Sequence, residues 1–438
     1  MQGMKLFSRH ATERAAHLLN AFPVVVITGA RQVGKTTLAR LLVEAAGGDY
    51  VTLDDLAVAD RAARDPRGLV RGAAEGLLAI DEVQLVPDLL REVKLAVDEE
   101  PGRRFLLTGS ANLLKMKSVT ESLAGRSAWL EIGPLSWSEL AGMPRPRTID
   151  VAFDTISAEE YAETITTFAG PSDHHALDTA RGLIVGGSMP RVLTLDEEMK
   201  AVWYEGYRTT FLERDLRQLG NVEDLGDFNR TLALVMHRTA NILNMSSLGS
   251  DVGITHKTVK RYLGLLETGY QLRLLPPYYA NVGKRLVRSP KVFARDAGMA
   301  SHIMGVRSWQ EAVSSGRDGA LLETWAIAEV LALDALASRP ASAHYWRTSG
   351  GAEVDLLLER GESVVGIEVK SRATIRYADT ASLRSIREDL GERFKLGIIA
   401  NLGTEVRVVD DRIVVVPVPM LLGAGSPAIP ELVALLRR

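Results

Sequence analysis

A glycine-rich segment between residues 24 and 40 has the residue types and spacing of a phosphate-binding turn. Four apolar residues, 24–27, precede Thr28, and the turn then reads G-x4-G-K-T-T. Where a buried strand turns into a helix, unpaired backbone N–H groups meet at the positive end of the helix dipole, which favours polyphosphate. A lysine after the second glycine can reach the β- and γ-phosphates, and the next hydroxyl can ligate Mg²⁺. We therefore predict an ATP and Mg²⁺ site formed by Gly29, Ala30, Arg31, Gln32, Val33, Gly34, Lys35, Thr36 and Thr37.

An acidic pair follows a second strongly apolar segment. Residues 76–80 read as a buried strand, and Asp81 and Glu82 come directly after it. One carboxylate at the carboxyl end of such a strand can hold Mg²⁺, and a second can polarise the water that attacks the γ-phosphate. We therefore assign Asp81 to the metal and Glu82 to the water. An acidic pair that only begins a solvated loop is the alternative.

Two more polar positions follow in the order expected of an ATPase. Residues 105–108 read as a strand whose tip carries Ser110, which we expect to sense the γ-phosphate, and Arg126 precedes a last strand. This order of motifs resembles the AAA-type ATPases. The resemblance implies that Arg126 acts on the nucleotide of a neighbouring subunit, and hence that the protein forms a homo-oligomer. An arginine that caps its own helix against the dipole is the alternative.

A second set of chemically competent residues lies near the C-terminus. Glu323 falls on a nearly all-apolar helix, where a carboxylate needs a partner, and Asp355 precedes a strand in which Glu368 and Lys370 share one face. Two carboxylates and a lysine on one side of a hairpin can hold Mg²⁺ and orient an attacking water. The pattern D-x12-E-x-K resembles the PD-(D/E)xK nuclease fold, and Glu323 matches the helical acidic residue of some of its branches. The alternatives are an exposed charged hairpin and an inactive DNA clamp.

Basic residues gather between these two regions, in a segment that reads as three short helices and a hairpin. Lys257, Lys260 and Arg261 lie opposite the apolar stripe of the third helix. The following segment has no acidic residue and carries Arg273, Lys284, Arg285, Arg288, Lys291 and Arg295. We interpret the segment as a winged helix that grips DNA phosphates. A winged helix that docks a protein instead is the alternative.

Composition describes an ordinary globular protein of several domains. The chain has 438 residues, of which 46% are hydrophobic and 24% charged, with a net charge of −3. It has no cysteine, which excludes disulfides and thiolate chemistry. The N-terminal residues lack the apolar core of a signal peptide, and no run approaches membrane-spanning length. We therefore expect a cytoplasmic protein with no membrane contact.

The elements that must position these residues give an α/β protein of four parts. The expected parts are a P-loop AAA-type parallel-sheet domain over 1–140, a helical lid or linker over 141–222, a winged helix over 223–297 and an α/β restriction-endonuclease-like domain over 298–438. Over nearly its whole length the chain resembles prokaryotic AAA-type ATPases with these additions. The resemblance implies an ATPase that couples hydrolysis to DNA binding or cleavage. A regulatory switch on protein partners, with an inactive nuclease-like domain, is the second hypothesis.

Overall fold

The structure is a computed structural model, and its contacts divide the chain into two units. It describes residues 7–73, 76–109, 123–169, 172–210, 222, 224–279 and 289–423. The expectations for Ser110, Lys284, Arg285 and Arg288 fall outside the described residues. The N-terminal unit comprises Met1–Pro134 with Thr268–Tyr270, and the C-terminal unit comprises Leu135–Glu267 with Gln271–Arg438.

The N-terminal unit contains a parallel sheet. Its strands are β1 (Val24–Thr28), β2 (Gly48–Thr52), β3 (Leu77–Asp81), β4 (Arg104–Gly109) and β5 (Ser127–Glu131). The order is β2-β3-β4-β1-β5, and every neighbouring pair is parallel. All five residues of β1 and of β3 are buried, as expected for strands covered on both faces. The predicted parallel sheet is therefore confirmed.

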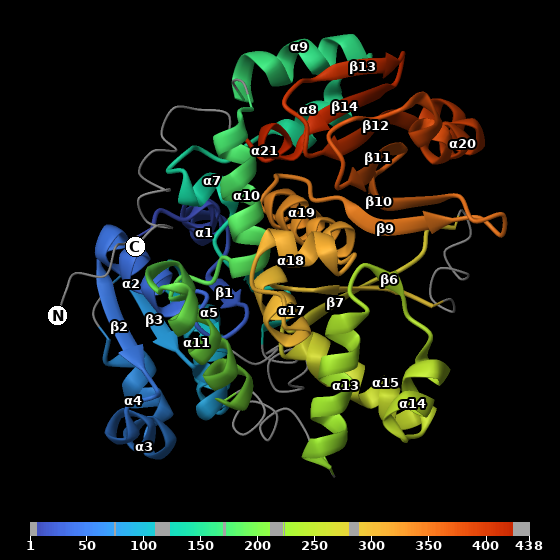
Figure 1. Ribbon diagram of the computed structural model, residues 1–438. Coiled ribbons are helices and arrows are strands. Elements are labelled where there is room, and N and C mark those ends of the chain that lie inside the picture. Colours follow the sequence, from blue (N-terminus) through green and yellow to red (C-terminus); the bar gives the residue numbers. More distant parts are fainter. Residues whose placement is uncertain are drawn as a thin grey trace. The chain divides into compact units, whose positions relative to one another are not determined.

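Helices precede and connect these strands (Figure 1). They are α1 (His10–Ala21), α2 (Lys35–Ala46), α3 (Leu56–Arg64), α4 (Pro66–Arg71), the short η1 (Val83–Leu85) and α5 (Leu89–Glu99). Of these, α3, α4, η1 and α5 share an apolar core with the sheet. Asp55 begins α3 by accepting hydrogen bonds from two backbone N–H groups, and Asp65 caps α4 in the same way. The core contains buried residues of β1, β3 and β4, so the carboxyl ends of these strands are firmly positioned.

The C-terminal unit begins with a series of helices. They are α7 (Trp137–Leu140), α8 (Thr148–Asp154), α9 (Ala158–Ala169), α10 (His174–Gly186), η3 (Val192–Thr194) and α11 (Glu197–Thr210). Of these, α8 and α9 pack on the large sheet of the unit. Thr148 donates to the Leu421 carbonyl at 2.6 Å, and the Ala158 N–H donates to the Asp411 carbonyl at 2.9 Å. The expectation of a separate lid or linker over 141–222 therefore does not describe α8 and α9, because they form part of the C-terminal domain.

A group of helices with a small antiparallel sheet comes next. It consists of α13 (Leu225–His237), β6 (Asn241–Ile242), α14 (Met245–Val252), α15 (His256–Thr268), β7 (Leu272–Leu275) and β8 (Lys291–Ala294), with strand order β6-β8-β7. Gly253, with φ 86°, ends α14 in the left-handed region and allows the sharp turn into α15. Three helices therefore occur where the sequence places them.

The last part is a mixed sheet with helices against it. Its helices are α17 (Ala297–Met304), α18 (Trp309–Ser314), α19 (Asp318–Ala335), α20 (Ala381–Leu390) and α21 (Val418–Leu421), with the short η5 (Tyr377–Thr380) and η6 (Gly391–Arg393). Its strands are β9 (Ser342–Arg347), β10 (Glu353–Arg360), β11 (Ser363–Lys370), β12 (Phe394–Asn401), β13 (Arg407–Asp410) and β14 (Ile413–Pro417), in the order β13-β14-β12-β11-β10-β9. None of the helices in the described ranges has the length and apolar character needed to cross a bilayer.

Candidate functional site

The turn between β1 and α2 needs glycine at two positions. Gly29 has φ 147°, and a Cβ there would lie 2.1 Å from the Ile132 carbonyl oxygen. Gly34 has φ 101° and is the N-cap of α2, so it opens the first turn of that helix. The described backbone therefore has the strand, turn and helix that the sequence predicts for a phosphate site.

Lys35 is buried beneath this turn. Lys35 is the first residue of α2 and is 5% exposed. The Nζ atom donates to the carbonyls of Gly29 at 3.0 Å and Ala30 at 2.8 Å. These contacts keep the ammonium at the turn, where a phosphate bound by the N-terminus of α2 would meet it.

Arg9, which sequence reasoning missed, supports the same turn from the segment before α1. Its guanidinium donates to the Val33 carbonyl at 2.8 Å and to the Gly133 carbonyl at 2.9 Å. Of the other residues in the turn, Arg31 and Thr37 are half-buried and Gln32 is exposed with φ 62°. Arg9 therefore braces one side of the turn while Lys35 braces the other.

Asp81 accepts hydrogen bonds from three side chains. Thr36 donates to Oδ2 at 2.9 Å, Tyr50 donates to the same oxygen at 2.7 Å, and Thr108 donates to Oδ1. Burial raises the pKa of Tyr50 to about 12, and its contact with Asp81 adds to the rise, so the phenol keeps its proton and remains a donor. This arrangement holds the carboxylate in one orientation at the end of β3.

Thr36 and Asp81 suit a hydrated Mg²⁺. A hydroxyl and a carboxylate, both hard oxygen donors, lie within hydrogen-bond distance of each other beside the phosphate turn. Thr36 would ligate the ion directly and Asp81 would hold it through water. When bound, the ion would neutralise charge that develops on the phosphates.

Glu82 follows Asp81 in an unusual backbone conformation. Its φ of 58° and ψ of 42° lie in the left-handed region, which is uncommon for a residue other than glycine. The Glu82 N–H donates to Thr108 Oγ1 at 3.3 Å, and the side chain accepts from Gln84. Thr108 thus links both acidic residues to the end of β4. The order of residues in the sequence does not indicate this contact.

Arg126 lies just before β5 and pairs within its own unit. Its Nε and Nη2 atoms donate to Asp98 at 2.6 and 2.9 Å, and Nη1 donates to the Ala124 carbonyl at 3.2 Å. The Asp98 contacts tie the arginine to α5, and only the Ala124 contact is of the kind expected of a helix cap. The role toward a neighbouring subunit remains a prediction.

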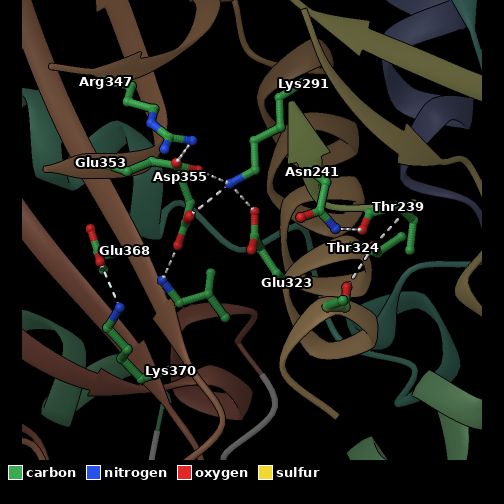
Figure 2. A network of polar contacts seen from close by, with 12 residues as sticks. Thr239, Asn241, Lys291, Glu323, Thr324, Arg347, Glu353, Asp355, Glu368 and Lys370 are labelled. Carbon is green, nitrogen blue, oxygen red and sulfur yellow. Dashed lines mark hydrogen bonds and ion pairs between the residues drawn. The ribbon is translucent and has the colours of Figure 1, made fainter. Parts of the chain in front are cut away.

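A buried lysine lies at the centre of the C-terminal acidic residues. Lys291 projects from β8, and its Nζ atom lies 2.7 Å from Glu323, 2.6 Å from Glu353 and 2.9 Å from Asp355 (Figure 2). Its side chain is only 2% exposed. Burial alone would lower the pKa of Lys291, but the three carboxylates raise it above its usual value, so the ammonium stays charged.

Lys291 also corrects the expected DNA surface. The sequence places it among the basic residues of 273–295 that would contact phosphates. A side chain enclosed by three carboxylates cannot reach a phosphate, so Lys291 does not belong to that surface. The partner that Glu323 was expected to need is thus found in this lysine.

Glu368 and Lys370 form a second pair on the same hairpin. Lys370 Nζ donates to Glu368 Oε1 at 2.6 Å, and Asp355 Oδ2 accepts from the Val369 N–H at 2.9 Å. Burial, followed by the charge of Asp355, raises the pKa of Glu368 to about 8, although Lys370 opposes the rise. The predicted common face of Glu368 and Lys370 is therefore confirmed by their direct contact.

The expected Mg²⁺ site of Glu323, Asp355 and Glu368 is not the arrangement found. Across the described ranges, no group of three or more histidine, cysteine, aspartate or glutamate side chains is placed to hold a metal ion. The physical reason is that the Lys291 ammonium lies among the carboxylates. The carboxylates as folded therefore do not fit a metal ion, because the ammonium takes its place.

The exposed basic residues lie on α15. Lys257, Lys260 and Arg261 are exposed, whereas Val259, Tyr262 and Leu263 of the same helix are buried. The predicted division of this helix into an apolar and a basic face is therefore present. The basic face carries these three cations at the surface of the helix.

Comparison with protein families defines the class of the N-terminal unit. Residues 21–141 match a family described as an AAA domain. Two further families, each described as a domain of unknown function, match residues 177–310 (DUF8612) and 318–421 (DUF4143). With its parallel sheet and P-loop, the N-terminal unit is an AAA-type ATPase domain, and the match supports ATPase activity.

Comparison with whole proteins gives the family of the chain. It is 31% identical over 435 residues to "Uncharacterized protein Rv2008c" of Mycobacterium tuberculosis and to "Uncharacterized protein Mb2031c" of Mycobacterium bovis. The alignments cover 99% of this chain and 88% of each relative. The chain belongs to the family of these mycobacterial proteins.

Two solved structures are loosely similar. A Walker-type ATPase of Pyrococcus abyssi gives a TM-score of 0.41 at 14% identity, over 68% of this chain and 96% of that one. A signal transduction ATPase with a tetratricopeptide repeat sensor, from Pyrococcus horikoshii, gives 0.22 at 12%, over 74% and 45%. Scores this low do not establish a shared fold over the whole chain.

Proposed function

We propose that the protein is an ATPase whose nucleotide state controls the binding of DNA. The observation that carries the ATPase part is the contact of Thr36 with Asp81 at 2.9 Å, beside the buried Lys35. In this proposal Lys35 and the N–H groups at the start of α2 bind the phosphates, and Thr36 and Asp81 hold Mg²⁺. Glu82 orients the attacking water, and Arg126 completes the site of a neighbouring subunit in a homo-oligomer.

The DNA part of the proposal is supported by the exposed basic face of α15. We interpret α13, α14 and α15 with the sheet β6-β8-β7 as a winged helix. Lys257, Lys260 and Arg261 would contact phosphates, and Arg273 of β7 and Arg295, directly after β8, would add to the positive charge. Phosphate contacts position a protein on DNA without reading sequence, so we expect weak sequence specificity.

Salt dependence of DNA binding tests this part directly. The wild type should bind duplex DNA with an affinity that falls steeply with salt. Replacing Lys257, Lys260 and Arg261 together by Glu should flatten the slope of log K against log salt by roughly 0.9 for each lost phosphate contact. An unchanged slope would place the DNA contact elsewhere.

A matched control separates local contacts from total charge. Replacing the exposed Arg64, Arg67 and Arg147 by Glu changes the net charge by the same amount and leaves the α15 residues in place. This control should keep the wild-type slope. If both triple variants lose binding equally, attraction is a property of the whole charge and the α15 surface is not the site.

A regulatory switch acting on protein partners is the second candidate function. The observation in its favour is the ammonium within the C-terminal carboxylates, which leaves that domain without an arrangement for metal-dependent cleavage. Absence of DNA binding at low salt, together with an ATPase rate that DNA does not change, would favour the switch. A DNA-stimulated ATPase rate would favour the first proposal.

A further inference from the structure

We propose that the Lys291 ammonium takes the place of a divalent cation among Glu323, Glu353 and Asp355, so that these residues form a metal site closed from within. Figure 2 shows the lysine reaching from β8 into three carboxylates that come from α19 and β10. Carboxylate oxygens from separate elements, converging on one cation, are the ligand set that Mg²⁺ and Mn²⁺ prefer. This inference goes beyond the proposed ATPase and DNA-binding function and does not depend on it.

The backbone that carries Lys291 is fixed on both sides. β8 is the central strand of its sheet, and Lys291 is paired with Ile242 of β6 and Leu275 of β7. The Ala294 N–H donates to Thr239 Oγ1 at 3.0 Å, and Thr239 is hydrogen-bonded to Thr324 at 2.8 Å. Thr324 is next to Glu323 on α19, so this network joins the strand of the lysine to the helix of its partner.

The cluster holds more carboxyl groups than cations. Lys291 contacts three carboxyl groups, and the only other cation in ion-pair contact with them in the described part of the chain is Arg347, at 3.4 Å from Glu353. Glu323 and Asp355 have no cation but Lys291 within ion-pair distance among the described residues, and burial raises the pKa of Glu323 well above its usual value. Lys291 is therefore the only cation shared by all three carboxyl groups among the described residues, in the position that a divalent ion would take.

A buried oxygen beside the cluster offers a further ligand to a cation that would replace the ammonium. Leu356 of β10 is paired with Ile367 of β11, which puts Asp355 and Glu368 at opposing positions of the hairpin. Glu368 is 6% exposed, its Oε1 atom accepts from Lys370, and its Oε2 atom has no hydrogen-bond partner among the described residues. In a chain without Lys291, a cation held by Asp355 would have this oxygen within the same hairpin.

Mn²⁺ titration without nucleotide tests the proposal. The wild type should bind no Mn²⁺ through these carboxylates, whereas Lys291→Met should gain a site whose affinity is about ten-fold or more above any wild-type binding, because a repelling charge is removed. Adding Asp355→Asn to Lys291→Met should abolish the gain. Mn²⁺ should also raise the melting temperature of Lys291→Met and leave that of the wild type unchanged.

Two further variants keep the test decisive. Lys291→Met alone leaves buried carboxylates without their counter-ion and can fail to fold. The double variant Lys291→Met with Glu353→Gln removes one charge of each sign, so it should be less destabilised. Lys395→Met, on β12 of the sheet that contains Asp355, is the control for loss of a lysine and should not gain a site. ATP hydrolysis, measured on the same samples, reports on the N-terminal unit whatever the Mn²⁺ result.

Two outcomes would overturn the proposal. Mn²⁺ binding in the wild type that Asp355→Asn removes would show that the lysine does not close the site. A folded variant without Lys291 that still binds no Mn²⁺ would show that the carboxylates serve only as partners of the ammonium. The first measurement needs only folded wild type and Asp355→Asn, so it can overturn the proposal even if no Lys291 variant folds.

Discussion

Arg126 donates to both carboxylate oxygens of Asp98, at 2.6 and 2.9 Å, and so joins the start of β5 to the end of α5. The hydrogen bonds from Arg126 lower the pKa of Asp98, so the pair stays ionised at neutral pH. Both side chains are about one-third exposed, and such pairs contribute little to stability. An arginine held so near the surface can serve its own chain or a neighbouring subunit. The two roles predict different effects of substitution on ATP turnover.

Arg126→Ala should lower ATP turnover by about 10³-fold or more if the arginine acts on a neighbouring nucleotide, while ATP affinity stays nearly unchanged. Asp98→Ala is the matched control, because it breaks the same ion pair and keeps the guanidinium. It should retain most of the turnover. Equal losses in both variants would show that the arginine acts only through its pair with Asp98. Failure of co-assembled Arg126→Ala and Lys35→Ala subunits to recover activity would show that the arginine does not act on a neighbouring nucleotide.

Lys35→Ala and Glu82→Gln should separate ATP binding from hydrolysis. Removing Lys35 takes away a phosphate contact, so ATP binding should weaken. Glu82→Gln keeps the phosphate contacts and loses the carboxylate that orients water, so ATP should bind and remain intact. Equilibrium binding of a fluorescent ATP analogue and phosphate release measure the two steps, and wild-type turnover in Glu82→Gln would remove Glu82 from the mechanism.

Tyr50→Phe should lower turnover through Asp81 without touching the nucleotide itself. The phenol donates to Asp81 Oδ2 at 2.7 Å, and Phe keeps the ring that lies 4.6 Å from the Arg40 guanidinium carbon. We expect a loss of about ten-fold, equivalent to ~1.4 kcal/mol of transition-state stabilisation. If Asp81 holds Mg²⁺ as we propose, the variant should need more Mg²⁺ for half-maximal rate, whereas a purely structural role would leave that Mg²⁺ dependence unchanged.

The sequence predicts the P-loop strand and turn because all of their determinants are local. An apolar run, two glycines and a Lys-Thr pair fall within one short segment, and the backbone follows them. Tyr50 could not be assigned in this way. Its contact with Asp81 depends on the pairing of β2 with β3, in which Thr52 lies opposite Asp81, and a single sequence carries no signal for that register.

The partner of Glu323 in the carboxylate cluster also could not be identified from the sequence. The apolar neighbours of Glu323 predict that it needs a partner, but they do not say which of the chain's cations supplies it. Lys291 follows a basic stretch, which suggested an exposed phosphate contact. The apolar residues Val292, Phe293 and Ala294 directly after it were the available signal for a buried strand, and all three are buried.

Asp296→Asn should change how the stability of the C-terminal unit depends on pH. Asp296 begins α17, accepts from Tyr204 and the Met299 N–H at 2.8 Å each, and is half-buried, and its partial removal from water raises its pKa above 3.8. The native state therefore keeps a proton that the unfolded chain has already lost, so the wild-type free energy of unfolding should fall as pH rises from 3.8 to the native pKa. Urea denaturation at a series of pH values should show this fall in the wild type and in Asp224→Asn, a control at the exposed N-cap of α13, and not in Asp296→Asn. Parallel pH profiles for all three proteins would rule out Asp296 as the source of the dependence.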